Sequence, residues 1–176
     1  MPPEWRGTPA LSPLSVYGLS SFNYSLVGLL LASLLAWRPQ RALYAGEYVE
    51  AALWIWQGLI SYKCDAIDLA VESWSHPVDR VSATIFTVSQ VVKYSLVTCG
   101  GSLGPQLVAF LFAMLAVGLH AFHRSNVACR EKQVRAYAFW HVAWHVVFPL
   151  EMAVFYGAQF GAPPETVACR WRGAST

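Results

Sequence analysis

Charged residues are scarce in this sequence: they make up 12% of its 176 residues, whereas 56% are hydrophobic. The few charges gather between long apolar runs, and runs of about 20 such residues are typical of membrane-spanning helices. A net charge of +2 without a basic run argues against a nucleic-acid partner. We therefore predict an all-α, polytopic transmembrane helix bundle with membrane lipids around it.

Paired cysteines are also lacking. The four cysteines stand far apart without a CxxC spacing, so no disulfide framework or cysteine-rich metal site is predicted. Residues 1–15 contain four prolines and no basic region that leads into an apolar core, which is unlike a cleavable signal peptide. We expect the first span to act as an uncleaved signal anchor instead.

The apolar runs divide the chain into an irregular lead-in (1–15), a transmembrane bundle (16–160) and an irregular tail (161–176). Proline, glycine and charged residues separate five expected spans within the bundle, at 16–37, 47–72, 81–99, 106–123 and 134–160. Five spans place the two termini on opposite sides. Six lysines and arginines then lie on the N-terminal side and four on the other, which favours a cytoplasmic N-terminus.

The second expected span carries a polar stripe. At 100° per residue, six side chains fall close to one line along the helix: Glu50, Gln57, Ser61, Asp65, Asp68 and Glu72. Carboxylates that face lipid cost several kcal/mol, so the stripe is expected to face other helices or a wet cavity. The alternative is that its lower half emerges into water.

Two charged residues stand just before the third expected span, and one stands within it. Asp79 either caps the start of that helix or belongs to a site. Arg80 is expected at the membrane interface. Lys93, near the far end, is expected to extend toward the lipid headgroups rather than to pair inside the bundle.

The fifth span contains the segment Trp140-His141-Val142-Ala143-Trp144-His145. His141 and His145 are four residues apart, so on a helix they project from one face. Two such imidazoles can hold one metal ion, donate to one anion or relay a proton. Pro149, one turn later, is expected to kink or locally open the helix.

These patterns predict one candidate site. Its members come from three spans: Ser61, Asp65 and Asp68 from the second, Asp79 from the third, and His141 and His145 from the fifth. Zinc takes three or four nitrogen, oxygen or sulfur ligands, often with one position open for water. We expect His141 and His145 to bind zinc with Asp65 or Asp79 as a further ligand. Ser61 and Asp65 are the candidate catalytic residues, with Ser61 positioning the attacking water or the forming oxyanion.

The segment from Tyr137 to His145 resembles the last-helix signature of the CREST superfamily of membrane hydrolases, particularly its myomaker-like branch. Ser61 followed by Asp65, and then Asp79 before a third helix, is similar to the earlier motifs of that superfamily. The resemblance implies a zinc-dependent amide or ester hydrolase that acts on a lipid. Two features depart from the family pattern: Asp65 or Lys63 stands where a second-helix histidine is expected, and five spans are found here instead of seven.

A second hypothesis remains open. The small size, eight tryptophans and short loops also suit a non-catalytic accessory subunit of a larger energy-transducing or photosynthetic membrane complex. The histidines would then ligate haem or chlorophyll, or hydrogen-bond to neighbouring helices. Proton-coupled transport along the polar stripe is a third, less favoured interpretation.

Overall fold

A computed structural model describes residues 5, 7–42, 46–99 and 103–161, and this part of the chain is helical without a strand. Five long helices account for most of it: α2 (Phe22–Trp37), α3 (Glu47–Tyr62), α4 (Ser75–Cys99), α5 (Pro105–Arg130) and α6 (Val134–Gly161). Shorter elements complete it: η2 (Pro9–Leu11), α1 (Val16–Ser20), η3 (Pro39–Arg41) and η4 (Lys63–Ile67). The all-α prediction is confirmed.

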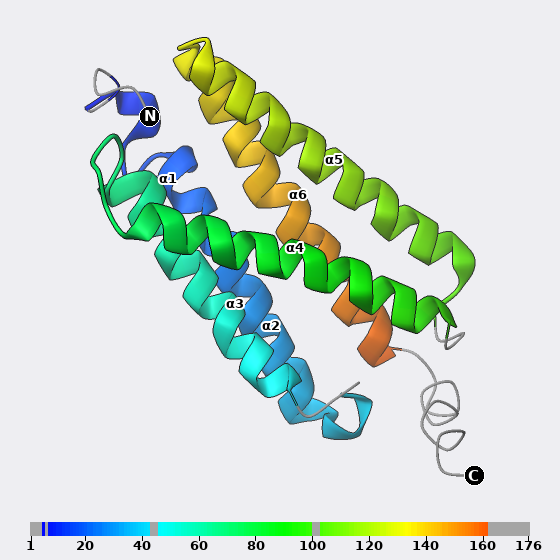
Figure 1. The fold of residues 1–176 in the computed structure, drawn as a ribbon. Coiled ribbons are helices and arrows are strands. Elements are labelled where there is room, and N and C mark those ends of the chain that lie inside the picture. The colour runs from blue at the N-terminus through cyan, green and yellow to red at the C-terminus, as the bar shows by residue number, and fades with distance from the viewer. Residues whose placement is uncertain (1–4, 6, 43–45, 100–102, 162–176) are drawn as a thin grey trace.

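The helices form two packed pairs with a fifth helix across them. α2 packs along α3, α5 packs along α6, and α6 also packs against α2. Figure 1 shows α4 crossing obliquely over the space between the two pairs, and α4 has only sparse contacts with α5. Side chains from α3, α4 and α6 can therefore lie close together inside the bundle.

Three stretches of the described chain are long and apolar enough to cross a membrane: Pro9–Trp37, Pro105–Arg130 and Val134–Gly161. Such stretches are typical of an integral membrane protein. α3 and α4 stand where two further spans are expected, but they carry more polar residues. The number of crossings and the orientation remain predictions.

α2 and α3 approach each other closely because glycines stand at their contact. A Cβ atom on Gly28 would lie 2.5 Å from the carbonyl oxygen of Ala51, and one on Gly58 would lie 2.7 Å from the backbone nitrogen of Ser25. The hydroxyl of Ser25 donates to the carbonyl of Ile55 at 2.9 Å across the same contact. Small residues at such crossings allow the backbones of membrane helices to pack directly.

Gly58→Ala is expected to lower the free energy of unfolding by about 1–3 kcal/mol, because the added methyl group overpacks the contact with Ser25. Gly157→Ala in α6 is the matched control, since a Cβ there meets nothing within 4 Å. Detergent-induced unfolding followed by circular dichroism measures both. Equal stability of the two variants would contradict the close α2–α3 contact.

The second span ends earlier than expected. α3 stops at Tyr62 and continues as one π-helical turn, η4, in which the backbone N–H of Asp68 donates to the carbonyl of Lys63. Ala70 then takes a positive φ of 58°, so Glu72 lies in a loop. The prediction that Asp68 and Glu72 continue the helical stripe was wrong.

Asp68 explains why the helix ends where it does. Its carboxylate accepts hydrogen bonds from Lys63 and Ser75, at 2.7 and 2.6 Å, and one from Ser73. Side chains that bond locally in this way compete with continued helix. The same donors, Lys63 foremost, hold the pKa of the Asp68 carboxyl well below its ordinary value. Asp68 is thus a loop-organising residue and lies apart from the candidate site.

The third span begins earlier than expected, at Ser75 rather than at residue 81. Pro77 fits in the first turn, where its missing N–H has no intrahelical partner to lose. Asp79 therefore lies within α4 and does not cap it, so that alternative was wrong.

Lys93 does not extend to the headgroups. It is 6% exposed and forms an ion pair with Glu50 of α3, which is 7% exposed. The hydroxyl of Tyr156 completes this cluster: it donates to Glu50 at 2.7 Å, and the ammonium group of Lys93 donates to it at 3.2 Å. The prediction was wrong because it considered α4 alone, whereas Glu50 belongs to the stripe on α3.

The described residues of the lead-in pack against α6. Trp5 and Leu11 are buried against the start of α6, and the ring of Trp5 lies 5.1 Å from that of Tyr137. The predicted tail beyond residue 161 lies outside the described residues.

Candidate metal centre

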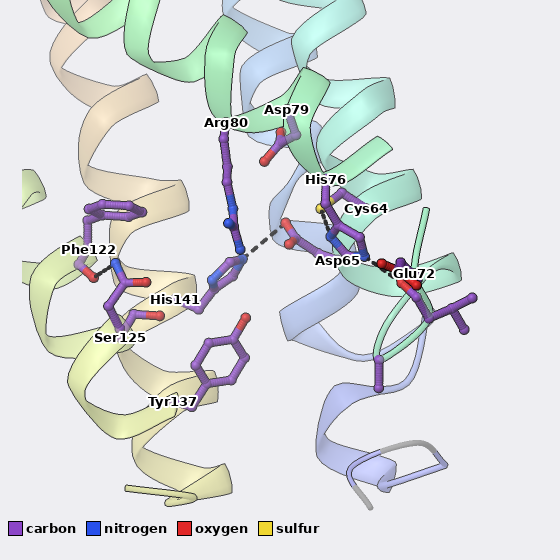
Figure 2. A pocket seen from close by; sticks show the side chains of 13 residues that line it. Cys64, Asp65, Glu72, His76, Asp79, Arg80, Phe122, Ser125, Tyr137 and His141 are labelled. Carbon is purple, nitrogen blue, oxygen red and sulfur yellow. Dashed lines mark hydrogen bonds and ion pairs between the residues drawn. The ribbon is translucent and has the colours of Figure 1, made fainter. Parts of the chain in front are cut away.

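Asp65, His141 and His145 come together inside the bundle. The Nε2 atom of His141 lies 3.1 Å from Oδ2 of Asp65, and Nε2 of His145 lies 3.6 Å from the same oxygen. One ligand atom from each residue falls within 4.8 Å of the other two, a spacing that suits a single metal ion. Figure 2 shows His141 of α6 and Asp65 of η4 pointing toward each other.

The helical spacing brings the two imidazoles together. On α6 their ring centroids are 4.2 Å apart, as four-residue spacing predicts. Asp65 reaches them from the π-helical turn η4, and π-helical turns occur frequently at functional sites. Its Oδ2 atom also accepts a hydrogen bond from Ser61 at 3.2 Å, and one from Ser21 at 3.5 Å.

Two serines fix the orientation of His145. Its Nδ1 atom lies 3.2 Å from the hydroxyl of Ser20 and 3.3 Å from that of Ser21. Ser20 donates its proton to the carbonyl of Tyr17 at 2.7 Å, and Ser21 donates to Asp65, so both oxygens are left to accept. Nδ1 of His145 therefore carries the proton, and Nε2 presents a lone pair toward Asp65.

Pro149 holds the same histidine in another way. Proline has no N–H, so the carbonyl of His145, four residues earlier, loses its intrahelical donor. The side-chain amide of Asn23 in α2 donates to that carbonyl at 3.0 Å. α6 continues through Pro149 as one helix. The local opening predicted for Pro149 is thus limited to one carbonyl, that of His145, which accepts from Asn23 and so joins α6 to α2.

These protonation states leave two acceptors facing each other. A lone pair on Nε2 of His145 and a carboxylate oxygen of Asp65 repel unless a proton or a metal ion lies between them. Two imidazoles and one carboxylate match the ligand types of catalytic zinc sites, in which a fourth position stays open. The residues present therefore fit a zinc ion, and the surrounding serines supply the outer hydrogen bonds that orient such ligands.

Of the remaining predicted site residues, Ser61 and Asp79 lie beside this group, whereas Asp68 bonds elsewhere. Ser61 is buried and bonds to Asp65. Asp79 is outside the three-residue metal group, and its carboxylate accepts a hydrogen bond from Gln57 at 2.8 Å. Asp79 nevertheless lines the cavities that His141 lines. Its role as a further ligand remains a prediction.

Sequence reasoning missed several residues around the centre. The sequence did not single out Ser20 and Ser21, because they stand more than 120 residues before His145, whose N–H they accept. Tyr17 and Tyr137 were not singled out either. Their hydroxyls lie 3.1 Å apart, and the ring of Tyr17 packs 4.9 Å from that of His141. The two tyrosines thus lie between His141 and Trp5 of the lead-in.

A pair outside the metal group was also missed. The thiol of Cys64 lies 2.8 Å from Nδ1 of His76, and Nε2 of His76 lies 2.9 Å from the carbonyl of Val71. Since a carbonyl only accepts, Nε2 carries the proton and Nδ1 accepts from the thiol. The pair fastens η4, and with it Asp65, to the start of α4.

Two cavities meet at the centre. One, of about 390 Å³, is lined largely by polar side chains that include Asp65, His76, Asn126 and His141 (Figure 2). The other, of about 410 Å³, is more apolar and extends past Leu119 and Trp144. Four residues line both cavities: Asp79, Arg80, Phe122 and His141. The site thus has one polar approach and one apolar approach.

Comparisons with protein-family models, with curated proteins and with solved structures gave no match.

Proposed function

We propose that this chain is a zinc-dependent membrane hydrolase that cleaves an ester or amide bond in a lipid. The observation that carries the proposal is the convergence of one possible ligand atom from each of Asp65, His141 and His145 on one point inside the bundle. The outer serines support it, because they leave His145 in the tautomer that a metal ligand requires. The CREST resemblance points to the same chemistry.

A bound zinc ion would lower the pKa of water and polarise a carbonyl group. The chain itself supplies the geometry. Asp65 and the two imidazoles would hold the ion, and Ser61 and Ser21 orient the Asp65 carboxylate. The polar cavity admits water, while the apolar cavity beside Trp144 suits a hydrocarbon chain.

The reaction balances without a further reactant. The oxygen of one water adds to the carbonyl carbon, and the carbon–oxygen or carbon–nitrogen bond to the leaving group breaks. A proton from the water passes to the departing alcohol or amine, and the other product is a fatty acid. Asp79 lines the same cavities and is placed either to complete the ligand set or to hold a proton nearby.

Metal analysis and hydrolysis together test the proposal. The chain purified in a neutral detergent is expected to contain about one zinc ion. It is also expected to release fatty acid from an ester-linked or amide-linked lipid, as detected by mass spectrometry. Treatment with a chelator should abolish the release, and added zinc should restore it.

Three results would contradict the proposal. A chain that binds no zinc even after incubation with the ion has no such centre. Release that persists unchanged after chelation would show that the metal is not needed. A zinc-loaded chain that cleaves neither kind of lipid and migrates within a larger membrane complex would favour the accessory-subunit hypothesis instead.

A further inference from the structure

Arg80 is the charged residue of the site that the proposed chemistry leaves unused. It lies in the second turn of α4 and lines both cavities together with His141. Figure 2 shows its side chain extending along the polar cavity toward His141. Within the described part of the chain, its guanidinium group makes no hydrogen bond and no salt bridge, unlike Lys63 and Lys93.

Arg80 is an exposed residue of α4, and its guanidinium group is open to the polar cavity that it lines. Because no acceptor of the described residues occupies this group, it can bind an acceptor from outside the chain. The nearest carboxylate along the chain, Asp79, instead accepts from Gln57, whose side-chain carbonyl in turn accepts from Ser82. The expectation that Arg80 lies at the membrane interface stays a prediction, and its side chain also lines both cavities of the site.

The charges around the site leave room for an anion. Asp65 and Asp79 both line the polar cavity, and a divalent ion on Asp65 would offset their two charges. The charges of Arg80 and Glu72 would then cancel in sum, but the two side chains lie on opposite sides of Asp65, so the positive charge is local to Arg80 (Figure 2). At the same end of the bundle, the last turns of α5, the connection to α6 and the start of α6 carry four exposed basic residues and the acidic Glu131; the basic residues are Arg124, Arg130, Lys132 and Arg135. An anionic group is therefore favoured there.

The polar and apolar linings of the two cavities indicate which chemical groups a bound anion carries. A guanidinium group binds phosphate oxygens with two parallel hydrogen bonds. Two neutral groups that can donate hydrogen bonds also line the polar cavity: the Ser125 hydroxyl and the Asn126 amide, one N–H of which donates to the carbonyl of Phe122 at 3.0 Å. From Arg80 the apolar cavity continues between α4 and α5, past Leu119, Phe122 and Trp144. A phosphate group joined to a hydrocarbon chain matches both cavities.

We infer that Arg80 binds the phosphate group of an anionic amphiphile, which occupies the apolar cavity with its hydrocarbon chain. This inference rests on the proposed function, since it names the substrate class of the same site. Arg80 acts as a specificity residue and need not touch the metal ion.

The test titrates dodecyl phosphate into the purified protein in neutral dodecyl maltoside micelles and measures binding by isothermal calorimetry. Arg80→Gln is expected to weaken binding at least tenfold, and Arg80→Lys should weaken it less because the charge remains. Arg124→Gln is the matched control: Arg124 is exposed at the same end of the bundle, over the ring of Trp140, and lines neither cavity. Its binding should match that of the unmodified protein.

Two results would overturn the inference. Equal weakening by Arg80→Gln and Arg124→Gln would mean diffuse attraction to a basic surface. Inorganic phosphate that binds as tightly as dodecyl phosphate would mean a free-phosphate site rather than an amphiphile site. Zinc content, measured in every variant, separates this inference from the proposed function: Arg80→Gln should retain the metal. Binding of dodecyl phosphate to a chain that never hydrolyses lipid would leave the inference standing while the hydrolase proposal fails.

Discussion

Replacement of Lys93 by methionine is expected to lower the free energy of unfolding by about 3–5 kcal/mol. The substitution would leave the Glu50 carboxylate buried between α3, α4 and α6 without its cation. Tyr156 would still donate to Glu50, and Trp54 to Tyr156, but neither carries a compensating charge. Unfolding in mixed micelles with increasing sodium dodecyl sulfate, followed by far-ultraviolet circular dichroism, measures the difference.

Two further variants decide whether the loss comes from the buried Glu50 carboxylate. Lys63→Met removes a similar cation from the partly exposed pair with Asp68 and should cost no more than about 1 kcal/mol. The double variant Lys93→Met with Glu50→Leu should recover most of the loss, because apolar side chains then replace both members of the buried ion pair. A double variant as unstable as Lys93→Met alone would refute this explanation.

Asp65→Asn is expected to weaken zinc binding by at least about 100-fold, more than typical losses from outer hydrogen-bond partners. The substitution keeps the size of the side chain and its contacts with Ser61 and Ser21, but it replaces a charged ligand oxygen by a neutral amide. Competition with a chromophoric chelator measures the affinity in detergent.

Asp68→Asn is the matched control for this experiment, because Asp68 stands three residues away and bonds only within its own loop. Its zinc affinity should equal that of the unmodified chain, and a comparable loss would point to a general distortion of η4. Asp79→Asn should weaken zinc binding by about tenfold if Asp79 acts from outside the metal group. A loss as large as that of Asp65→Asn would make Asp79 a ligand.

The helices were largely predictable because apolar runs and helix-breaking residues mark them. The expected last span, 134–160, agrees with α6 to within one residue, since the turn before it and the glycine at its end are plain in the sequence. The boundaries of the second and third spans were not predictable in this way. Asp68 bonds to Ser73 and Ser75, and these side chains come close to it in space only once the loop has formed.

The candidate site was predictable where one helix sets the geometry. The four-residue spacing of His141 and His145 requires only a helix, and the polar stripe on α3 indicated that Asp65 faces inward. Contacts between helices could not be read in the same way. The contribution of Ser20 to His145 depends on how α1 packs against α6, and the pairing of Lys93 with Glu50 depends on the path of α4.

The π-helical turn at residues 63–67 lies between the part of the chain that packs α3 on α2 and the loop that leads to α4. Gly28 and Gly58, which set the packing of α2 on α3, come before this turn, whereas Asp65 lies within it. Insertion or removal of one residue there would leave the paired helices in register but would change which side chain faces His141. Such turns can arise from a one-residue insertion into an ordinary helix. The packing of α2 on α3 and the candidate site therefore depend on chain length at different positions, the first before this five-residue segment and the second within it.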